Sequence, residues 1–364
     1  MLRRRTSSPL VRLARHRART FAGVFTGVLA AALVAACSDR VPTVPGGGAA
    51  RPAAAASARG RVEVTRYDAK DLAEYQQMWS NPYGRLELDA GGTMSVSGAT
   101  GVTVRAEPFH VGADYSVFDH LKYIAVSNQA FAVPAHGSLT FAVQIDASTT
   151  GAVAGRVIHG CYGPPGSMDD DPARCTAPWS ASTFQGQQAG VVLNMINFRT
   201  GQLFDWFVSG NEVFALIERL PSNVTGSPGV GLDKAYTQII RTRTIAAGAS
   251  HFVAITYTRT PDGSSVQYFL DGERFATVDD VGVPLDVQGV SYTGVYPSLG
   301  PGEPVANDVD VFVIGHGLFS LLDAFPFQHP DRPDLSVSVP MSERLFGQGA
   351  TGSWRHFTVT RITY

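Results

Sequence analysis

Two carboxylates, Asp205 and Glu218, have the clearest potential for chemistry in this sequence. Each lies in a run of strand-forming residues, Gln202–Ser209 or Val213–Arg219. The intervening Gly210-Asn211 is typical of a two-residue hairpin turn, here of type II′. In that register Asp205 and Glu218 are diagonal neighbours on one face of the hairpin, with Cβ atoms about 7–8 Å apart.

Carboxylates at this spacing can share a proton, bind a sugar hydroxyl or flank a water molecule in an inverting hydrolysis. The alternative is structural: Glu218 pairs with an arginine and Asp205 accepts backbone hydrogen bonds at a sheet edge. Phe207 and Phe214 share this face, where they stack on a sugar ring or lie beneath a loop. We expect the face to turn toward solvent. The opposite face is predicted to be core: Phe204, Trp206, Val208, Val213, Ala215 and Ile217.

Histidines offer a second kind of candidate. His316 lies between two glycines in Gly315-His316-Gly317. Flanking glycines permit close approach of another backbone, which suits a binding site. The alternative is a buried histidine held by hydrogen bonds. Asp119-His120 has suitable residue types, but adjacent strand residues face opposite ways and cannot orient each other. His159, just before Cys161, is a third possibility with no stronger support.

Asp169, Asp170 and Asp171 supply three consecutive carboxylates, the ligand type that Ca²⁺ prefers. Their order lacks the alternating Asp-x-Asp-x-Asp-Gly pattern of calcium loops. A solvated acidic loop without a cofactor is therefore favoured over a calcium site.

Cys161 and Cys175 flank that acidic segment. In an oxidising compartment two cysteines so close in sequence predict a disulfide, which contributes about 3 kcal/mol in the chain-entropy model. A metal site is the alternative, but it lacks a neighbouring cluster of cysteines or histidines.

The first residues predict export. Residues 1–36 carry seven arginines and no acidic residue, and the apolar run Phe21–Ala36 is too short for a membrane span. The ending Leu33-Val34-Ala35-Ala36-Cys37 resembles the lipobox of bacterial lipoproteins. That resemblance implies a signal peptide over 1–36, a lipid on Cys37 and anchoring to the cell membrane or outer membrane. An ordinary signal peptide or an uncleaved anchor is the alternative.

Removal of residues 1–36 leaves 22 basic and 31 acidic residues, because seven of the 29 basic residues are lost; the net charge becomes −9. An acidic chain without a basic stripe is not expected to bind nucleic acid. Residues 37–60 are rich in Pro, Gly and Ala and predict a flexible linker behind the lipid. Residues 61–364 are predicted to form a single domain.

Strand-like runs separated by Gly, Pro, Asn and Asp dominate the rest, and helical periodicity is confined to Asp68–Trp79 and Leu318–Ala324. We therefore predict an all-β fold: a two-sheet antiparallel β-sandwich, or jelly roll, with few short helices. The strand runs are Leu139–Ile145, Val191–Phe198, Gln202–Ser209, Val213–Arg219, Phe252–Thr258, Val266–Leu270, Arg274–Val278, Val309–Ile314 and Phe357–Ile362.

The stretch His251–Tyr257, the turn Pro261-Asp262-Gly263 and the hairpin Val266–Gly272 resemble the concanavalin A-like lectin and glucanase superfamily. The closing segment Trp354–Thr360 is similar to the usual last strand of that superfamily. Three other segments resemble an uncharacterised bacterial family, a domain of unknown function: Gln202–Gly210, Tyr296–Glu303 and Ile314–Pro330.

Laminarinase-type enzymes of that superfamily carry a Glu-x-Asp-x-(x)-Glu strand. Around Asp205 the glutamates are replaced by Leu203 and Val208, so the retaining mechanism of the superfamily is not expected. The resemblance, the predicted export and the missing glutamates together favour non-catalytic binding of a glycan or polysaccharide at the cell envelope. The ligand-binding residues would be Asp205, Phe207, Phe214, Glu218 and His316. The alternatives are a glycosidase or lyase that uses Asp205 and Glu218, and a structural module that binds other proteins.

Overall fold

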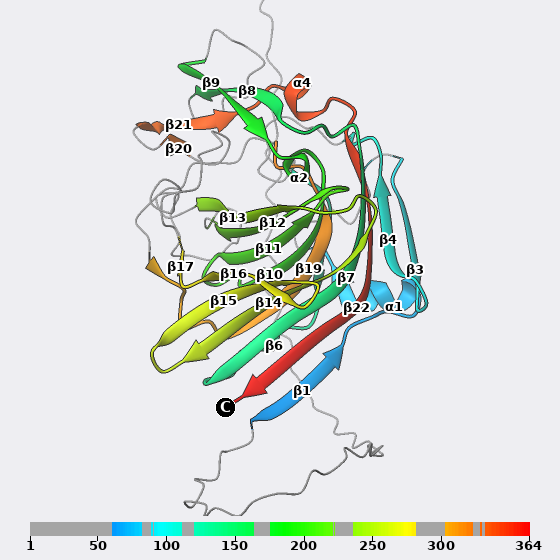
Figure 1. The fold of residues 1–364 in the computed structure, drawn as a ribbon, viewed down its shortest axis with the longest axis vertical. Helices are drawn as coiled ribbons and strands as arrows, with labels where there is room; N and C mark the ends of the chain where they lie inside the picture. Colours follow the sequence, from blue (N-terminus) through cyan, green and yellow to red (C-terminus); the bar gives the residue numbers. More distant parts are fainter. Residues whose placement is uncertain are drawn as a thin grey trace, which may run out of the picture. The chain divides into compact units, whose positions relative to one another are not determined.

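Two antiparallel sheets of eight strands each face one another in the protein (Figure 1). The computed structural model describes residues 60–81, 89, 91–110, 120–163, 175–220, 222, 236–281, 303–322, 328–329 and 332–364. All of these residues belong to one unit, Ser57–Tyr364.

Sheet A has the strand order β16-β15-β14-β7-β22-β4-β3, with β1 paired to β22. Its strands are β1 (Arg61–Arg66), β3 (Thr93–Ser97), β4 (Gly101–Ala106), β7 (Gly137–Thr150), β14 (Ser250–Thr260), β15 (Gly263–Leu270), β16 (Glu273–Val278) and β22 (Gly349–Thr363).

Sheet B has the order β13-β12-β11-β10-β19-β5-β2, with β6 paired to β19. Its strands are β2 (Trp79–Ser80), β5 (Leu121–Ser127), β6 (Phe131–Ala132), β10 (Gly190–Ile196), β11 (Gln202–Val208), β12 (Glu212–Arg219), β13 (Tyr236–Thr244) and β19 (Val311–Phe319).

Two smaller sheets and three short helices complete the described elements. A four-stranded sheet contains β8 (Arg156–Gly163), β9 (Ala177–Thr183), β20 (Gln328–His329) and β21 (Arg332–Ser338), and β17 (Asp280–Val281) pairs with β18 (Glu303–Pro304). The helices are α1 (Leu72–Met78), α2 (Gln185–Gln188) and α4 (Met341–Arg344).

The predicted all-β, two-sheet antiparallel sandwich with few short helices is confirmed. Each predicted strand run overlaps an observed strand. The helix expected within 68–79 is α1, whose first turn is capped by the Asp71 side chain accepting from the Glu74 N–H at 2.9 Å. A helix from Leu318 is wrong in the described part, because β19 continues to Phe319 and Leu318 pairs with Tyr123 of β5.

The core between sheets A and B follows from the period-two alternation of side chains. The face of the β11–β12 hairpin that contains Phe204 and Trp206 lies in this core, as predicted. The Trp206 indole N–H donates to the Ala254 carbonyl at 2.9 Å, and the Trp354 indole donates to the Val192 carbonyl at 3.1 Å. These bonds satisfy the polar atom of each tryptophan while the rings join the two sheets.

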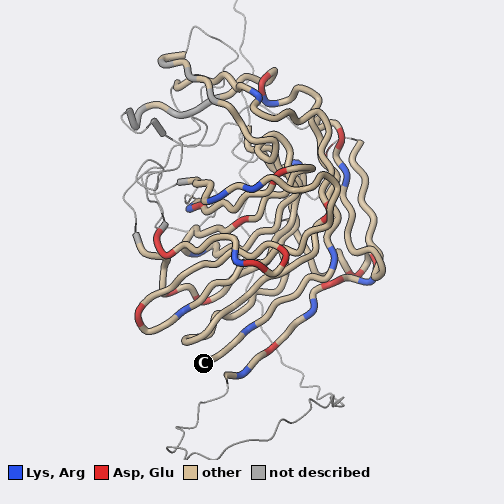
Figure 2. Tube along the Cα trace, in the orientation of Figure 1, with Lys and Arg blue, Asp and Glu red and all other residues tan. Residues whose placement is uncertain are grey.

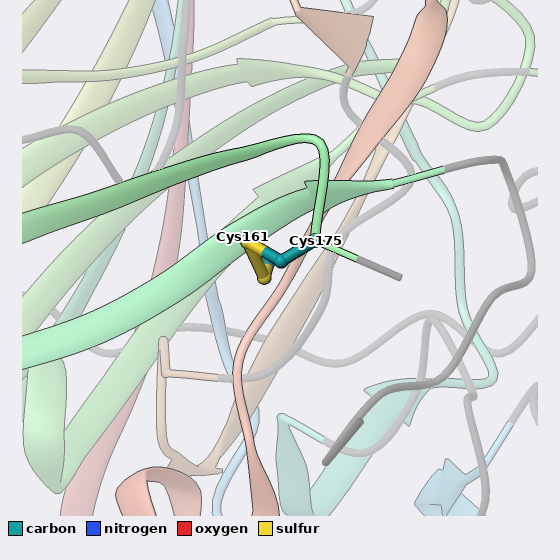
Figure 3. Close-up of a disulfide and its surroundings, with 2 residues drawn as sticks. All are labelled: Cys161 and Cys175. Atoms are coloured by element: carbon teal, nitrogen blue, oxygen red, sulfur yellow. A yellow bond between two sulfur atoms is a disulfide. The ribbon is translucent and has the colours of Figure 1, made fainter. Parts of the chain in front are cut away.

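The disulfide between Cys161 and Cys175 is confirmed, with sulfur atoms 2.01 Å apart (Figure 3). It joins the end of β8 to the segment before β9. Asp169, Asp170 and Asp171, in the loop that it closes, lie outside the described residues, so the calcium site stays a prediction.

Removal of this disulfide is expected to lower the free energy of unfolding by about 3 kcal/mol, because the loop it closes is about 15 residues long. Urea unfolding of the protein should show this difference between the native chain and a Cys161→Ser, Cys175→Ser double variant. Reductant should have no effect on the double variant. Equal unfolding midpoints for the two chains would contradict the expectation.

The predictions for the N-terminal region concern residues that the structure does not describe. The signal peptide over 1–36, the lipid on Cys37 and the linker up to residue 59 lie outside them. Within the part of the chain that is described, no helix is long and apolar enough to cross a membrane. Among the described residues, acidic and basic side chains intermix along the tube of Figure 2, without a continuous basic stripe.

Candidate functional site

The β11–β12 hairpin has the predicted register. Asp205 lies opposite Leu216, and the Ser209 N–H donates to the Glu212 carbonyl at 2.7 Å. The predicted type II′ turn is wrong, because Gly210 does not adopt the positive φ which that turn requires. The Ser209 hydroxyl instead accepts from the Glu212 N–H at 3.0 Å and helps to close the turn.

The expectation that Asp205 and Glu218 face solvent is wrong. Both lie on the outer face of sheet B, away from sheet A, but their exposed fractions are 0% and 5%. The reason is a second apolar cluster, which buries this face as well. Its buried members are Leu121, Ile124, Val126, Val192, Ile196, Leu203, Phe207, Phe214, Leu216, Leu220, Ile239, Phe319 and Leu321.

Asp205 is held from the neighbouring strand. The Asn194 amide on β10 donates to Asp205 Oδ1 at 2.5 Å, directly across the strand pair. The second oxygen, Asp205 Oδ2, and Asn194 Oδ1 are buried and accept no hydrogen bond from the described chain. Buried acceptors without donors are costly, about 1–3 kcal/mol each. A proton on Asp205 would supply a donor at this point of the face.

Glu218 accepts from the Thr237 hydroxyl on β13 at 2.6 Å. The predicted structural alternative, an arginine partner for Glu218 and a sheet edge for Asp205, is thus also wrong. The partner is a neutral hydroxyl, and β11 and β12 are interior strands of sheet B.

Burial raises the pKa of both acids. For Asp205, burial acts first, the nearby Glu218 charge adds to it, and the Asn194 hydrogen bond opposes it, leaving the pKa well above its ordinary range. Burial raises the pKa of Glu218 to about 7, against the hydrogen bond from Thr237. An uncharged carboxyl is favoured wherever water is excluded. Both carboxyl groups therefore favour the protonated form at mildly acidic pH.

Phe207 and Phe214 lie opposite each other on the same face, with rings 4.8 Å apart and nearly parallel at 6°. Both are fully buried. Each ring thus covers a face of the other, and neither presents that face to a sugar. Phe214 also supports α2, since a side chain at Gly186 would lie 2.5 Å from its ring.

His316 is not brought to the acids. It pairs with Leu193 rather than Asn194 and so points into the core between the sheets. There its Nε2 lies 2.8 Å from the Tyr75 hydroxyl, and the rings of Trp79 and Trp354 lie 4.4 Å and 4.8 Å away. The structural alternative, a buried histidine satisfied by two hydrogen bonds, is met only in part: His316 is buried, but Nδ1 has no partner in the described chain.

We expect His316 to stay neutral down to about pH 4, because burial lowers its pKa to about 3. A histidine whose folded pKa lies below its unfolded value of 6.5 destabilises the fold as pH falls below 6.5. Nitrogen chemical shifts of the His316 ring should show no titration between pH 8 and pH 5. A midpoint near 6.5 would contradict its burial.

The other histidine candidates are separate from this pair. His120 is buried at the start of β5 with its ring edge-on to Phe319, 5.7 Å away, and Asp119 lies outside the described residues. His159 is exposed on β8.

Two hydrogen-bond partners of the acids, Asn194 and Thr237, were not predicted from the sequence. A polar residue inside the apolar run of β10, Gly190–Ile196, is the signal that would have identified Asn194. No sequence signal pointed to Thr237, because its contact depends on the pairing of β12 with β13.

The outer face of sheet B remains open at the hairpin turn. A cavity of about 280 Å³ lies there, and Phe184, Gln185, Asn211 and Glu212 contribute to its wall. Glu212 is half-buried and accepts from the Gly186 N–H at 3.2 Å. Burial raises the pKa of Glu212, and the N–H groups of Gly186 and Gln185 oppose that shift.

Two antiparallel sheets packed face to face, with the acid pair on the outer face of one, define a β-sandwich. The chain belongs to the family described as "Family of unknown function (DUF6081)", whose profile matches residues 181–363. No curated protein matches the chain.

Solved structures with a similar fold share little sequence with this chain. An endo-1,3-beta-glucanase from Streptomyces sioyaensis is 12% identical over 86% of this chain and 100% of its own, with a TM-score of 0.36. The alginate lyase A1-II′, of polysaccharide lyase family 7, is 9% identical over 74% and 84%, with a TM-score of 0.36. The lectin UEA-II, complexed with galactose, is 9% identical over 83% and 99%, with a TM-score of 0.30.

Proposed function

We propose that this protein is a lipid-anchored envelope protein whose β-sandwich binds carbohydrate without cleaving it. The export and anchoring rest on the basic segment, the apolar run and the lipobox-like ending at Cys37. The carbohydrate ligand rests on the resemblance to lectins and glucanases, which is an analogy at the level of the fold, and on the polar groups of the outer face of sheet B.

The observation that carries the non-catalytic proposal is the sealing of Asp205 and Glu218 within the second apolar cluster. A glycosidase needs one carboxyl ionised and both in reach of the glycosidic bond. Here neither acid reaches solvent, and raised pKa values favour the protonated forms. The positions that carry glutamates in laminarinases are Leu203 and Val208, which lie on opposite faces of β11.

A polar acceptor supports the binding part of the proposal. Asn211 Oδ1 is buried and accepts no hydrogen bond from the described chain. Sugar hydroxyls are donors as well as acceptors and would satisfy such an atom. Asn211 belongs to the turn of the hairpin and lines the cavity there, so a rotation of its side chain would bring it to a ligand without displacing the apolar cluster.

A glycosidase or lyase is the second candidate, and the pKa of Glu218, raised to about 7, favours it, since a general acid needs a pKa near the working pH. In that case Asp205, Phe207, Phe214 and Glu218 would contact substrate after the cluster has opened. Binding and cleavage measured together separate the two candidates.

Polysaccharide pull-down and release of new chain ends should be measured on the same samples of the protein and of an Asp205→Asn, Glu218→Gln double variant. We expect both forms to retain a polysaccharide and neither to release chain ends. Chain-end release that the double variant abolishes would establish the enzyme instead. Retention that the double variant abolishes, in a folded protein, would show that the acids themselves contact the ligand. Failure to retain any polysaccharide would refute the proposal.

A further inference from the structure

The cavity at the turn of the β11–β12 hairpin combines groups that suit one kind of ligand. The residues that line it include the aromatic Phe184, the acidic Glu212 and the amide-bearing Asn211. The hydroxyl residues Ser182 and Thr244 are exposed at its border. An aromatic ring beside several hydrogen-bonding groups offers a surface for the apolar face of a sugar and partners for its hydroxyls.

The hydrogen-bonding capacity of this cavity is incompletely used by the protein. Asn211 Oδ1 is buried and has no donor in the described chain. The backbone carbonyl of Asn211 already accepts from the Ile245 N–H at 2.9 Å. A buried polar atom without a partner is costly, so a side-chain rotation that brings this oxygen to a hydroxyl donor in the cavity would be favourable.

The wall of the cavity is fixed before any ligand arrives. The Ser209 hydroxyl holds the Glu212 N–H at 3.0 Å, and the Gly186 N–H holds the Glu212 carboxylate at 3.2 Å. The buried Gln188 side chain binds the backbone of Val153 through both amide atoms, at 3.0 Å and 2.7 Å. Such preorganisation lowers the entropy lost on binding.

The charge and the volume of the cavity limit the class of ligand that it can bind. Glu212 is the single charged residue among those that line the cavity, all of which the structure describes. A carboxylate, sulfate or phosphate on the ligand would meet a half-buried negative charge without a counter-ion. The volume of about 280 Å³ lies just below the range of about 300–1,000 Å³ usual for small-molecule sites. The space therefore suits one sugar unit rather than a long stretch of polymer.

We propose that this cavity is a binding site for one neutral sugar unit, in which Glu212 and Asn211 bind hydroxyls and Phe184 packs against the ring. The site rests on the proposed carbohydrate-binding function and specifies where on the protein, and with which class of sugar, binding occurs. Acidic sugars are excluded by Glu212. The acid pair beneath the apolar cluster takes no part in the contact.

Titration calorimetry of the protein tests the site with two probes of equal length, a neutral β-glucan trisaccharide and a mannuronate trisaccharide. We expect the neutral probe to bind and the mannuronate probe not to bind. Glu212→Gln should weaken binding of the neutral probe about tenfold, since a charge-assisted hydrogen bond is replaced by a neutral one. Thr244→Trp, at an exposed position on the border, should block the cavity without disturbing the fold.

The matched control is Glu63→Gln. Glu63 lines another cavity, of about 300 Å³, where it pairs with Arg361 at 3.2 Å. This variant should bind the neutral probe as the native protein does. Unchanged binding in both the Glu212 and the Thr244 variants would overturn the site while leaving the proposed function intact. Preferred binding of the mannuronate probe would overturn the proposed class of sugar. Absence of binding by both probes, together with no retention of any polysaccharide, would overturn site and function together.

Discussion

Glu218→Gln should stabilise the protein by about 3 kcal/mol above pH 7 and leave its stability nearly unchanged below pH 4.5. Burial raises the pKa of Glu218 from 4.5 to about 7, and each unit of pH between these values corresponds to about 1.4 kcal/mol. A carboxyl with a raised folded pKa binds its proton more tightly in the folded state. Its stabilising contribution is therefore complete below pH 4.5 and is lost as pH rises through about 7.

Urea unfolding at a series of pH values measures this effect. The native protein should lose stability between pH 5 and pH 8 more steeply than the variant, whose amide cannot ionise. Glu63→Gln, a half-exposed position, is the control and should keep the steep dependence of the native chain. A constant difference between Glu218→Gln and the native protein at every pH would contradict the burial of the charge.

Phe214→Ala should lower the free energy of unfolding by about 3–5 kcal/mol and also weaken sugar binding. The first effect follows from the cavity left by a fully buried ring that stacks on Phe207. The second follows because Phe214 packs against Gly186 and lies 6.3 Å from the Phe184 ring, so its loss releases a wall of the cavity at the hairpin turn.

The control for this variant is Phe204→Ala. Phe204 is equally buried, but it lies on the inner face of β11 and packs near Phe312, 5.9 Å away. It should cost a similar free energy of unfolding, measured by urea, without weakening sugar binding at temperatures where both variants are folded. Equal losses of binding in the two variants would mean that binding follows global stability rather than the position of α2.

The local pattern of apolar, polar and turn residues was enough to predict the strands and the hairpin. Alternation along Gln202–Ser209 identified the inner face correctly, and the two residues Gly210-Asn211 fixed the register that places Asp205 opposite Leu216. The pattern was not enough for the turn type, because the Ser209 side chain bonds the backbone across the turn. A side chain that hydrogen-bonds the backbone in this way alters the turn locally, and the glycine alone does not predict it.

Burial of the outer face could not be derived from the hairpin. The residues that form the second apolar cluster come from distant segments, such as Leu121 of β5 and Phe319 of β19. One signal was present: β11 and β12 are apolar on both faces, with Leu203, Phe207 and Leu216 on the side expected to meet solvent. Continuous apolar character is typical of strands that are covered on both sides.

The contacts of the acids depended on strand order. Asn194 reaches Asp205 because β10 lies beside β11, and Thr237 reaches Glu218 because β13 lies beside β12. Sequence spacing alone specified neither neighbour. The position of His316 could not be predicted from sequence spacing either. A one-residue step along β19 separates Gly315, on the outer face, from His316, in the core between the sheets.

The titration of the carboxyl carbons of Glu218 and Asp205, followed by nuclear magnetic resonance in the protein, tests most directly whether these acids are closed off from water. We predict that Glu218 ionises near pH 7 and that Asp205 stays protonated well above its ordinary range. Ionisation of both groups near pH 4 would show instead that water reaches them, and the face now described as closed would be an open site.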